Sequence, residues 1–316
     1  MKKEKVLVIF FSETREYQHT FERYKRYVLD ELNADLALCV AINQRENQNN
    51  PFYKAAKYIW QYQEPEDWGK GFDFASSHEG VENRWRILED IKDQWLGGVK
   101  GPKTQKGSAG IMLFFRWFTK MKLLEKGLVE KYDRFIYTRS DYLYETPHIP
   151  LELLSKDKIW IPDGEDYGGV TDRYMACSAQ NIIPALSIAD PIIKTPLELF
   201  KEMTFFKEWN LEKFLKFSFK RTGLWDQVQR FPFTMYSLRS KGAHTSWTKG
   251  TFNRELEYFV KYQHEYDSAQ ISKAVFEKRG GWKARSVNQA LNKIKRKAFW
   301  TLQKNRILFV FSKLKS

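Results

Sequence analysis

Residues 5–42 read "KVLVIFFSETREYQHTFERYKRYVLDELNADLALCVAI", and their pattern predicts the fold class. It begins with a short apolar run of the kind that forms a buried strand. Phe21, Tyr24, Val28 and Leu32 then recur at helical spacing, and "DLALCVAI" is a second apolar run. A strand, a helix and a strand of these lengths predict a βαβ unit. The chain is therefore expected to form a parallel sheet within an α/β fold.

The composition is that of a globular protein. The chain has 316 residues, of which 42% are hydrophobic and 16% aromatic, enough for one large domain or two modest ones. Its two cysteines, Cys39 and Cys177, predict no disulfide framework and fit a reducing compartment. No run approaches the roughly 18 apolar residues that would span a bilayer. The N-terminal apolar run lacks a small-residue cleavage site and predicts a first strand, so we expect a cytoplasmic protein.

The positive charge is concentrated at the C-terminus. The net charge is +14, and residues 278–316 hold twelve Lys and Arg and no acid, which leaves about +2 for the rest. Within this tail, apolar residues share one helical face: Val287, Leu291, Ile294, Ala298 and Leu302. Such a basic amphipathic helix can lie on an anionic membrane, peripheral on the inner face. The alternatives are a helix packed on the body and a nucleic-acid-binding tail.

The pattern between residues 43 and 106 is looser, with polar and Gly/Pro-punctuated loops. This region is either an insertion that shapes an acceptor site or ordinary surface packing. Within it, "PFYKAAKYIWQY" (51–62) and "ENRWRILEDIKDQWL" (82–96) are interpreted as helices. We predict a main domain over 1–250, followed by a basic, helical C-terminal extension over 251–316.

A charged pair follows the next apolar run, "YDRFIYTRSDYLYE" (132–145). If the strand continues, Tyr137, Arg139 and Asp141 point to one side, with Arg139 and Asp141 ~6.6 Å apart along it. Ligands of open α/β sheets bind at the carboxyl ends of the strands. There Arg139 can bind a phosphate and Asp141 a divalent cation. The alternative is a local Arg–Asp salt bridge.

Two segments carry a resemblance to a known family. "KYDRFIYTRSDYLYE" followed by "IWIPDGEDYGGVTDRYMAC" resembles a group of glycosyltransferases with the GT-A fold. In these, an apolar strand leads into Arg-x-Asp, a variant of Asp-x-Asp, and a Gly-rich loop ending in Asp-Arg follows. The first βαβ unit is also similar, and the resemblance covers residues 5–42 and 105–190. It implies a GT-A-type, Rossmann-like, mostly parallel sheet flanked by helices.

The resemblance also implies the chemistry. A sugar would pass from a nucleotide diphosphate sugar to a glycan or glycolipid acceptor, including a lipid-linked one, in surface-polysaccharide synthesis. Asp141 matches the acid that contacts Mn²⁺ or Mg²⁺ or the donor. Arg139 stands where the second acid usually lies, so metal binding is weakened and Arg139, with Arg15 after the first strand, can carry the charge instead. Asp172 matches the acid of the Asp-Arg pair and is the first candidate for a base, with Asp166 second.

One histidine completes the candidate site. His244 lies on a late loop, where several GT-A families place a metal-binding histidine, although a lone histidine is more often structural. The chain has no P-loop, no GxGxxG and no zinc-type Cys/His cluster. The leading hypothesis is a membrane-associated glycosyltransferase with no nucleic-acid partner. A basic nucleic-acid-binding protein and a non-catalytic GT-A-like module remain alternatives.

Overall fold

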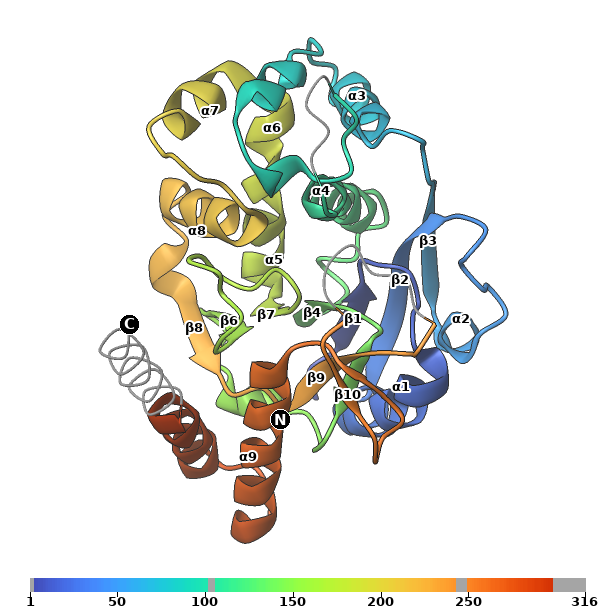
Figure 1. Ribbon diagram of the computed structural model, residues 1–316, viewed down its shortest axis with the longest axis vertical. Helices are drawn as coiled ribbons and strands as arrows, with labels where there is room; N and C mark the ends of the chain where they lie inside the picture. Colours follow the sequence, from blue (N-terminus) through green and yellow to red (C-terminus); the bar gives the residue numbers. More distant parts are fainter. Residues whose placement is uncertain (1–2, 102–105, 243–248, 298–316) are drawn as a thin grey trace, which may run out of the picture.

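The computed structural model describes residues 3–101, 106–242 and 249–297 (Figure 1). A seven-stranded sheet has the order β3-β2-β1-β4-β7-β6-β8, and a second sheet has the order β10-β11-β9-β5. The strands of the large sheet are β1 (Val6–Phe10), β2 (Ala34–Ile42), β3 (Tyr58–Gln63), β4 (Arg134–Thr138), β6 (Ile159–Pro162), β7 (Met175–Ser178) and β8 (Val228–Phe231). Those of the small sheet are β5 (Tyr142–Tyr144), β9 (Met235–Arg239), β10 (Thr251–Asn253) and β11 (Tyr258–Val260).

Helices surround the large sheet. They are α1 (Tyr17–Tyr24), α2 (Pro51–Ala55), α3 (Gly69–His78), α4 (Ala109–Glu125), α5 (Ala179–Leu186), α6 (Asp190–Lys194), α7 (Pro196–Met203), α8 (Leu211–Arg221) and α9 (Gln263–Arg279). A further helical stretch covers residues 284–297 and reaches the end of the described chain.

Most neighbours in the large sheet are parallel. β1 lies between β2 and β4 and is parallel to both, with Val8 opposite Leu36 and Ile136. β3 is parallel to β2 and β8 to β6, whereas β7 runs antiparallel to β4 and β6. This is the α/β architecture expected from the sequence, with a mostly parallel sheet flanked by helices.

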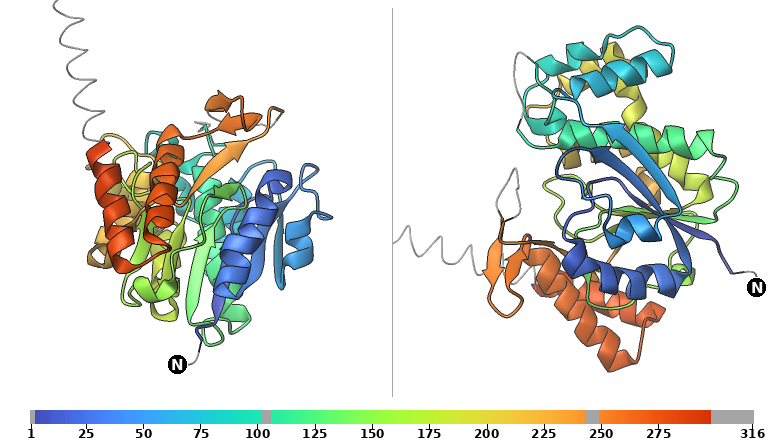
Figure 2. Two further views of the ribbon diagram at one scale, coloured as in Figure 1. Left: turned by 90° about the horizontal axis from the view of Figure 1, so that it is seen from below. Right: turned by 90° about the vertical axis from the view of Figure 1, so that its right-hand side faces the viewer.

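Alternate residues of β1 enter two different cores, because side chains alternate along a strand. Leu7 and Ile9 pack with α3, α4, α5 and α8 on one face of the sheet. Val6 and Val8 pack with α1, α2, α9 and residues 284–297 on the other. Figure 2 shows these two helical layers on opposite sides of the strands. The βαβ expectation is confirmed, since Tyr24 and Val28 are fully buried against the sheet.

The prediction of helices over residues 51–62 and 82–96 is wrong. α2 ends at Ala55, and residues 58–63 form β3 at the sheet edge. The reason is that Tyr58, Ile59, Trp60 and Tyr62 favour an extended chain, and β2 offers a free edge. Residues 82–96 instead form two short 3₁₀ turns, Trp85–Asp90 and Gln94–Leu96. Helix α3 was not predicted.

The described part of residues 251–316 is packed on the domain. Val275, Trp282, Val287 and Ala290 lie in the core that contains β1 and β2. The first part of the expected apolar face is thus covered by the body, as one alternative proposed. Ala298 and Leu302 lie outside the described residues, and the division at residue 250 stays a prediction. No helix in the described ranges is long and apolar enough to cross a membrane.

Trp282 should anchor the C-terminal helices. Its indole N–H donates to the carbonyl of Pro147 at 2.8 Å, and its ring contacts Phe276 at 5.5 Å between centroids. Trp282→Ala should lower the free energy of unfolding by about 3 kcal/mol, because a large buried side chain leaves a cavity. Chemical denaturation measures the loss. Lys283→Ala removes an exposed neighbour and should change stability by less than about 0.5 kcal/mol. Equal effects of the two variants would contradict this role.

Candidate active site

The chain changes sheets between Arg139 and Asp141. β4 ends at Thr138 in the large sheet, and β5 begins at Tyr142 in the small one. The expectation that one strand continues through Asp141 is therefore wrong. The two side chains nevertheless meet, since Arg139 Nε donates to Asp141 Oδ1 at 3.0 Å and Nη2 to Oδ2 at 2.6 Å. This crossing places the pair at the carboxyl end of β4.

A second arginine, which sequence reasoning missed, completes the cluster. Arg239, the last residue of β9, donates from Nη1 to Asp141 Oδ2, and both side chains are buried. Burial alone would raise the pKa of Asp141, but the charges of Arg139 and Arg239 hold it well below its usual range. Asp141 is thus a fixed anion between two guanidinium groups.

The surroundings of Asp141 do not fit a divalent cation. Both of its oxygens already accept from arginines, and Lys261 adds a third cationic group nearby. Within residues 3–101, 106–242 and 249–297, no group of three or more His, Cys, Asp or Glu could hold a metal ion. His244 lies outside the described residues. A metal role for Asp141 stays a prediction, and the ion pairing speaks against it.

A cavity of about 260 Å³ opens at the carboxyl ends of β1 and β2 and reaches the start of α4. Arg15, Arg139, Arg239 and Lys261 line it, so the structure brings both predicted donor-binding arginines to one place. Sequence reasoning missed Lys261, which follows β11 more than a hundred residues after Asp141. No local motif marks either Arg239 or Lys261.

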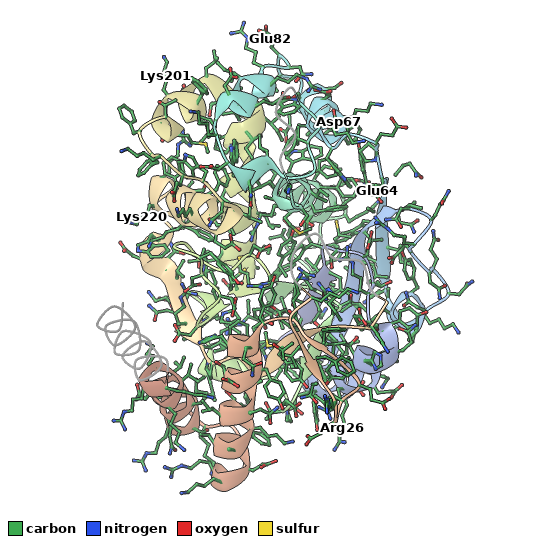
Figure 3. All side chains as sticks on the ribbon, in the orientation of Figure 1. Arg26, Glu64, Asp67, Glu82, Lys201 and Lys220 are labelled. Atoms are coloured by element: carbon green, nitrogen blue, oxygen red, sulfur yellow. The ribbon has the colours of Figure 1, made fainter. Side chains whose placement is uncertain are left out.

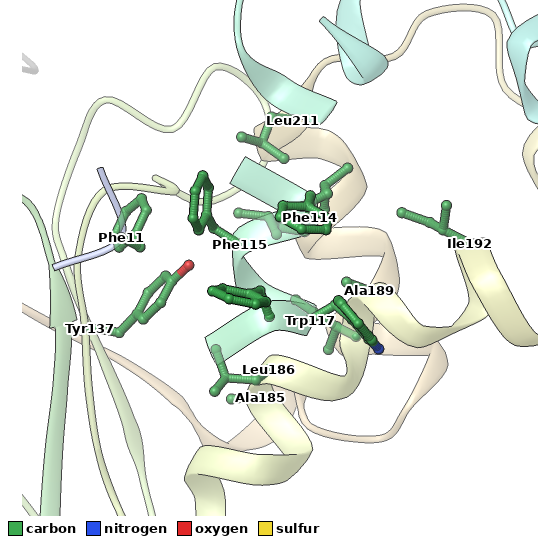
Figure 4. Packing of buried hydrophobic residues seen from close by; sticks show 14 of the residues in the cluster. Phe11, Phe114, Phe115, Trp117, Tyr137, Ala185, Leu186, Ala189, Ile192 and Leu211 are labelled. Atoms are coloured by element: carbon green, nitrogen blue, oxygen red, sulfur yellow. The ribbon is translucent and has the colours of Figure 1, made fainter. Parts of the chain in front are cut away.

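Aromatic side chains also line the cavity. They are Phe11, Trp68 and Phe115. Phe11 stacks on Tyr137 with centroids 4.0 Å apart and an angle of 8° between the rings. Figure 4 shows this stack with Phe115 of α4 beside it. A flat, partly apolar ligand group would find its complement here.

The part of the cavity lined by cationic side chains has the features of an anion site. Gly107 and Ser108, which precede the 17-residue helix α4, line the cavity. The first turn of a helix carries a partial positive charge. Independently, Arg239 is fully buried, and its Nε and Nη2 atoms have no hydrogen-bond partner among the described residues. Buried donors are nearly always satisfied in proteins, so these atoms point to an anionic ligand.

The rim of the cavity is closer to electrical balance. Glu13 pairs with Arg15 at 2.8 Å and with Arg45 at 3.1 Å. Arg45 also lies 3.4 Å from Glu64, which is labelled in Figure 3 just after β3. Arg15 therefore lines the cavity as an arginine already paired with a carboxylate. The surplus of positive charge lies deeper, at Arg139, Arg239 and Lys261.

The Gly-rich loop between β6 and β7 docks on the start of α8. Val170 N donates to the carbonyl of Glu212 at 3.2 Å. A Cβ on Gly169 would lie 1.8 Å from that same carbonyl oxygen, so only glycine allows this approach. Asp166 fastens the loop, because it accepts from Thr171 N at 3.1 Å and from Arg230 Nη1 at 2.9 Å. Its contacts are those of a structural residue.

Asp172 and Glu212 form a carboxyl pair next to this loop. The Asp172 side chain is 12% exposed, with Arg173 Nε at 3.9 Å. Burial, and then the charge of Asp172, raise the pKa of Glu212 to about 7. Burial lowers the pKa of Arg139, but Asp141, then Tyr262 and Asp172, raise it above its usual value, so Asp172 lies near the cationic cluster. Sequence reasoning missed Glu212, which only the docked loop brings to Asp172.

Arg173 connects the loop to the C-terminal helices. Its guanidinium lies over the ring of Tyr262 at 4.0 Å, and its Nη1 is 3.5 Å from Oε1 of Glu265 in α9. Glu265 is buried and accepts from Ser237 N in β9 at 2.8 Å. In the Asp-Arg motif, Arg173 thus has structural contacts, and Asp172 is the acid that is partly exposed.

A larger cavity of about 460 Å³ lies at the opposite, amino edge of the sheet. Its charged groups satisfy one another, with Lys57 Nζ 2.6 Å from Asp35 and the Tyr132 hydroxyl donating to Asp35 at 2.5 Å. Volume alone is therefore a poor guide, and the smaller cavity has the unsatisfied donors.

The comparisons with known proteins add little. Neither a family model nor a curated protein sequence matches the chain. The crystal structure of mouse xyloside xylosyltransferase 1, apo form, matches over 72% of this chain and 84% of that chain. Its TM-score is 0.38 and its identity 9%, which is too low to assign this chain a fold family or a function. The α/β fold rests on the sheet itself.

Asp141→Asn should destabilise the protein. The variant leaves two buried guanidinium groups without their anion, and breaking a buried ion pair costs about 3–5 kcal/mol. Thermal or urea unfolding measures this. Asp157→Asn is the control, because Asp157 is 65% exposed and its substitution should leave the free energy of unfolding nearly unchanged. An Asp141→Asn variant as stable as the control would show that the two arginines have another counter-ion.

Proposed function

We propose that this chain is a glycosyltransferase that takes a sugar from a nucleotide diphosphate sugar. The observation that carries the proposal is the cavity itself, which is lined by cationic side chains, by the residues that precede a helix and by aromatic rings. A diphosphate matches the cationic side chains and the helix start, and a base or sugar ring matches the aromatic rings. The resemblance of residues 131–145 and 159–177 to GT-A glycosyltransferases points the same way.

The proposed chemistry has two parts. The bond between the sugar C1 and the phosphate oxygen breaks, and the nucleoside diphosphate leaves with the electron pair. Arg139 and Arg239 would stabilise the growing negative charge, since fixed cations in a buried site are effective there. The acceptor hydroxyl forms the new bond to C1 and gives its proton to Asp172, with Glu212 as the neighbouring carboxyl. Asp166 would serve the reaction only through the loop that it holds.

The acceptor is proposed to be a glycan or glycolipid at the inner face of a membrane. Exposed basic side chains continue along the described C-terminal helices: Lys278, Arg279, Lys283, Arg285, Lys293, Lys295 and Arg296. With no acid after residue 277, this surface suits anionic lipid headgroups. The region 43–106 contributes Arg45, Glu64 and Trp68 to the cavity rim, so it would shape the donor side as well as any acceptor site.

Asp172→Asn tests the reaction. If Asp172 is the base, the variant should lose about 10²–10⁴-fold in kcat. Affinity for the nucleoside diphosphate should change less than about threefold, because the proposed contacts of the leaving group are with Arg139 and Arg239 and not with Asp172. The nucleotide is first chosen by a thermal-shift screen of nucleoside diphosphates and their sugars, with and without Mn²⁺ or Mg²⁺. Asp163→Asn, in the same loop, is the matched control.

Two results would contradict the proposal. No stabilisation by any nucleoside diphosphate would remove the donor site. A parallel loss of nucleotide affinity and of kcat in Asp172→Asn would move Asp172 from the acceptor to the donor.

Charge reversal tests the membrane surface. The triple variant Lys293→Glu, Lys295→Glu and Arg296→Glu should bind vesicles containing anionic lipid at least tenfold more weakly, because each basic residue contributes up to ~1 kcal/mol. Vesicle co-sedimentation measures the change. Lys54→Glu, Lys70→Glu and Lys100→Glu alter exposed side chains of the body by the same charge. Equal losses in the two triples would show that net charge decides binding. Tight DNA or RNA binding would favour the nucleic-acid alternative.

A further inference from the structure

We propose that Arg139, Arg239 and Lys261 bind the diphosphate of the donor directly, with no divalent cation between protein and phosphate, and that Lys261 takes up a proton when the diphosphate binds. This inference rests on the proposed function and assigns the groups that hold its leaving group. It departs from the Mn²⁺ or Mg²⁺ that the family resemblance implies.

The first argument is the convergence of three cations on one cavity. Arg139 follows β4, Arg239 ends β9 and Lys261 follows β11, and all three line the same cavity. Asp141 is the carboxylate that pairs with two of them. The cluster thus holds three cationic groups for one carboxylate, and the excess positive charge matches a multiply charged phosphate.

The second argument is the state of Arg239. Its Nη1 is committed to Asp141 and to the carbonyl of Leu238, whereas the buried Nε and Nη2 have no partner among the described residues. A guanidinium presents its donors as a planar fork that two phosphate oxygens can satisfy together. A metal ion offers no acceptor to these N–H groups. The unsatisfied fork therefore selects an oxyanion.

The third argument is the charge around Asp141. A divalent cation there would displace one of the arginines or stand beside two fixed guanidinium groups. Positive charges that share one carboxylate repel one another strongly in a buried site. The positive charge that a metal ion would supply is already provided by side chains of the protein.

Lys261 is the group that we expect to take up a proton when the diphosphate binds. Burial, then Arg239 and Arg139, lower its pKa to about 7, and Asp141 opposes them only in part. The further groups that face it are Arg173, which also lowers the pKa, and the Tyr262 ring, 5.2 Å from Nζ. Glu13, Arg15, Arg45 and Glu64 also line the cavity. A bound diphosphate adds negative charge beside Nζ and favours the ammonium form.

The sign of the pH dependence follows from linkage. Below pH 7 Lys261 is charged in both the free and the bound protein, and affinity is flat with respect to this group. Above pH 7 the free protein has lost the proton that the complex needs. Affinity should then fall by up to about tenfold for each pH unit as pH rises from about 7 to 9.

The first experiment asks whether a metal is needed. Calorimetry measures the Kd of the nucleoside diphosphate and of inorganic pyrophosphate, in EDTA and in Mn²⁺ or Mg²⁺. The expected change in Kd between these conditions is less than threefold. Binding that occurs only with the metal would overturn this inference and leave the glycosyltransferase proposal standing. Absence of binding under every condition would overturn both.

The second experiment isolates Lys261. Titrations at pH 8 in buffers of different ionisation enthalpy should show uptake of close to one proton by the native protein. Lys261→Arg keeps the charge at every pH, so it should bind as tightly at pH 9 as at pH 7 and take up no proton. Lys261→Met should bind at least tenfold more weakly, again without a pH dependence.

Lys57→Met is the matched control, since Lys57 lies at the opposite edge of the sheet. It should behave as the native protein, and thermal unfolding of each variant confirms that it is folded. Native affinity that does not vary between pH 7 and 9, or Lys261→Arg with the native slope, would overturn the role of Lys261.

Discussion

Asp141 and its two arginines hold the two sheets together at the place where the ligand cavity lies. Asp141 stands where the chain leaves β4 of the large sheet for β5 of the small one, and Arg239 reaches it from β9, which pairs with β5. The buried carboxylate therefore does three things through one set of contacts. It fixes the crossing of the chain, it orients two guanidinium groups toward the cavity, and it supplies the only negative charge that those groups share in the described structure.

The parts of the fold that could be predicted are those in which the pattern is local. The spacing of Tyr24, Val28 and Leu32 predicted the first helical segment, which the structure forms as α1 followed by a π-helical stretch, Lys25–Asp30. The apolar runs on each side predicted β1 and β2. β3 was mistaken for a helix because aromatic and apolar residues at 51–62 fit both periods over so short a run. The free edge of β2, which decides the matter, is a tertiary feature that no window of sequence contains.

The candidate site shows the same division. Arg139 and Asp141 could be found because they are neighbours at the end of an apolar run, and Asp172 because the Asp-Arg pair has a recognisable context. Arg239, Lys261 and Glu212 could not, since each reaches the site from a distant element. Glu212 depends on a backbone contact that only Gly169 permits. Glycine-rich loops read as flexible in sequence, whereas here the glycines allow one close and specific docking.

The distance along the chain between Asp141 and Arg239 bears on how the protein is made. These partners are 98 residues apart, so a ribosome adding ~5–20 residues per second needs roughly 5–20 s to deliver the second arginine. During that time the nascent domain has Arg139 as the partner of Asp141, and neither β9 nor α9 exists to bury the pair. The N-terminal half of the sheet can assemble early, but the cationic cavity is complete only after Lys261 has left the exit tunnel. Incomplete chains thus lack the full cluster of charged side chains that lines the cavity.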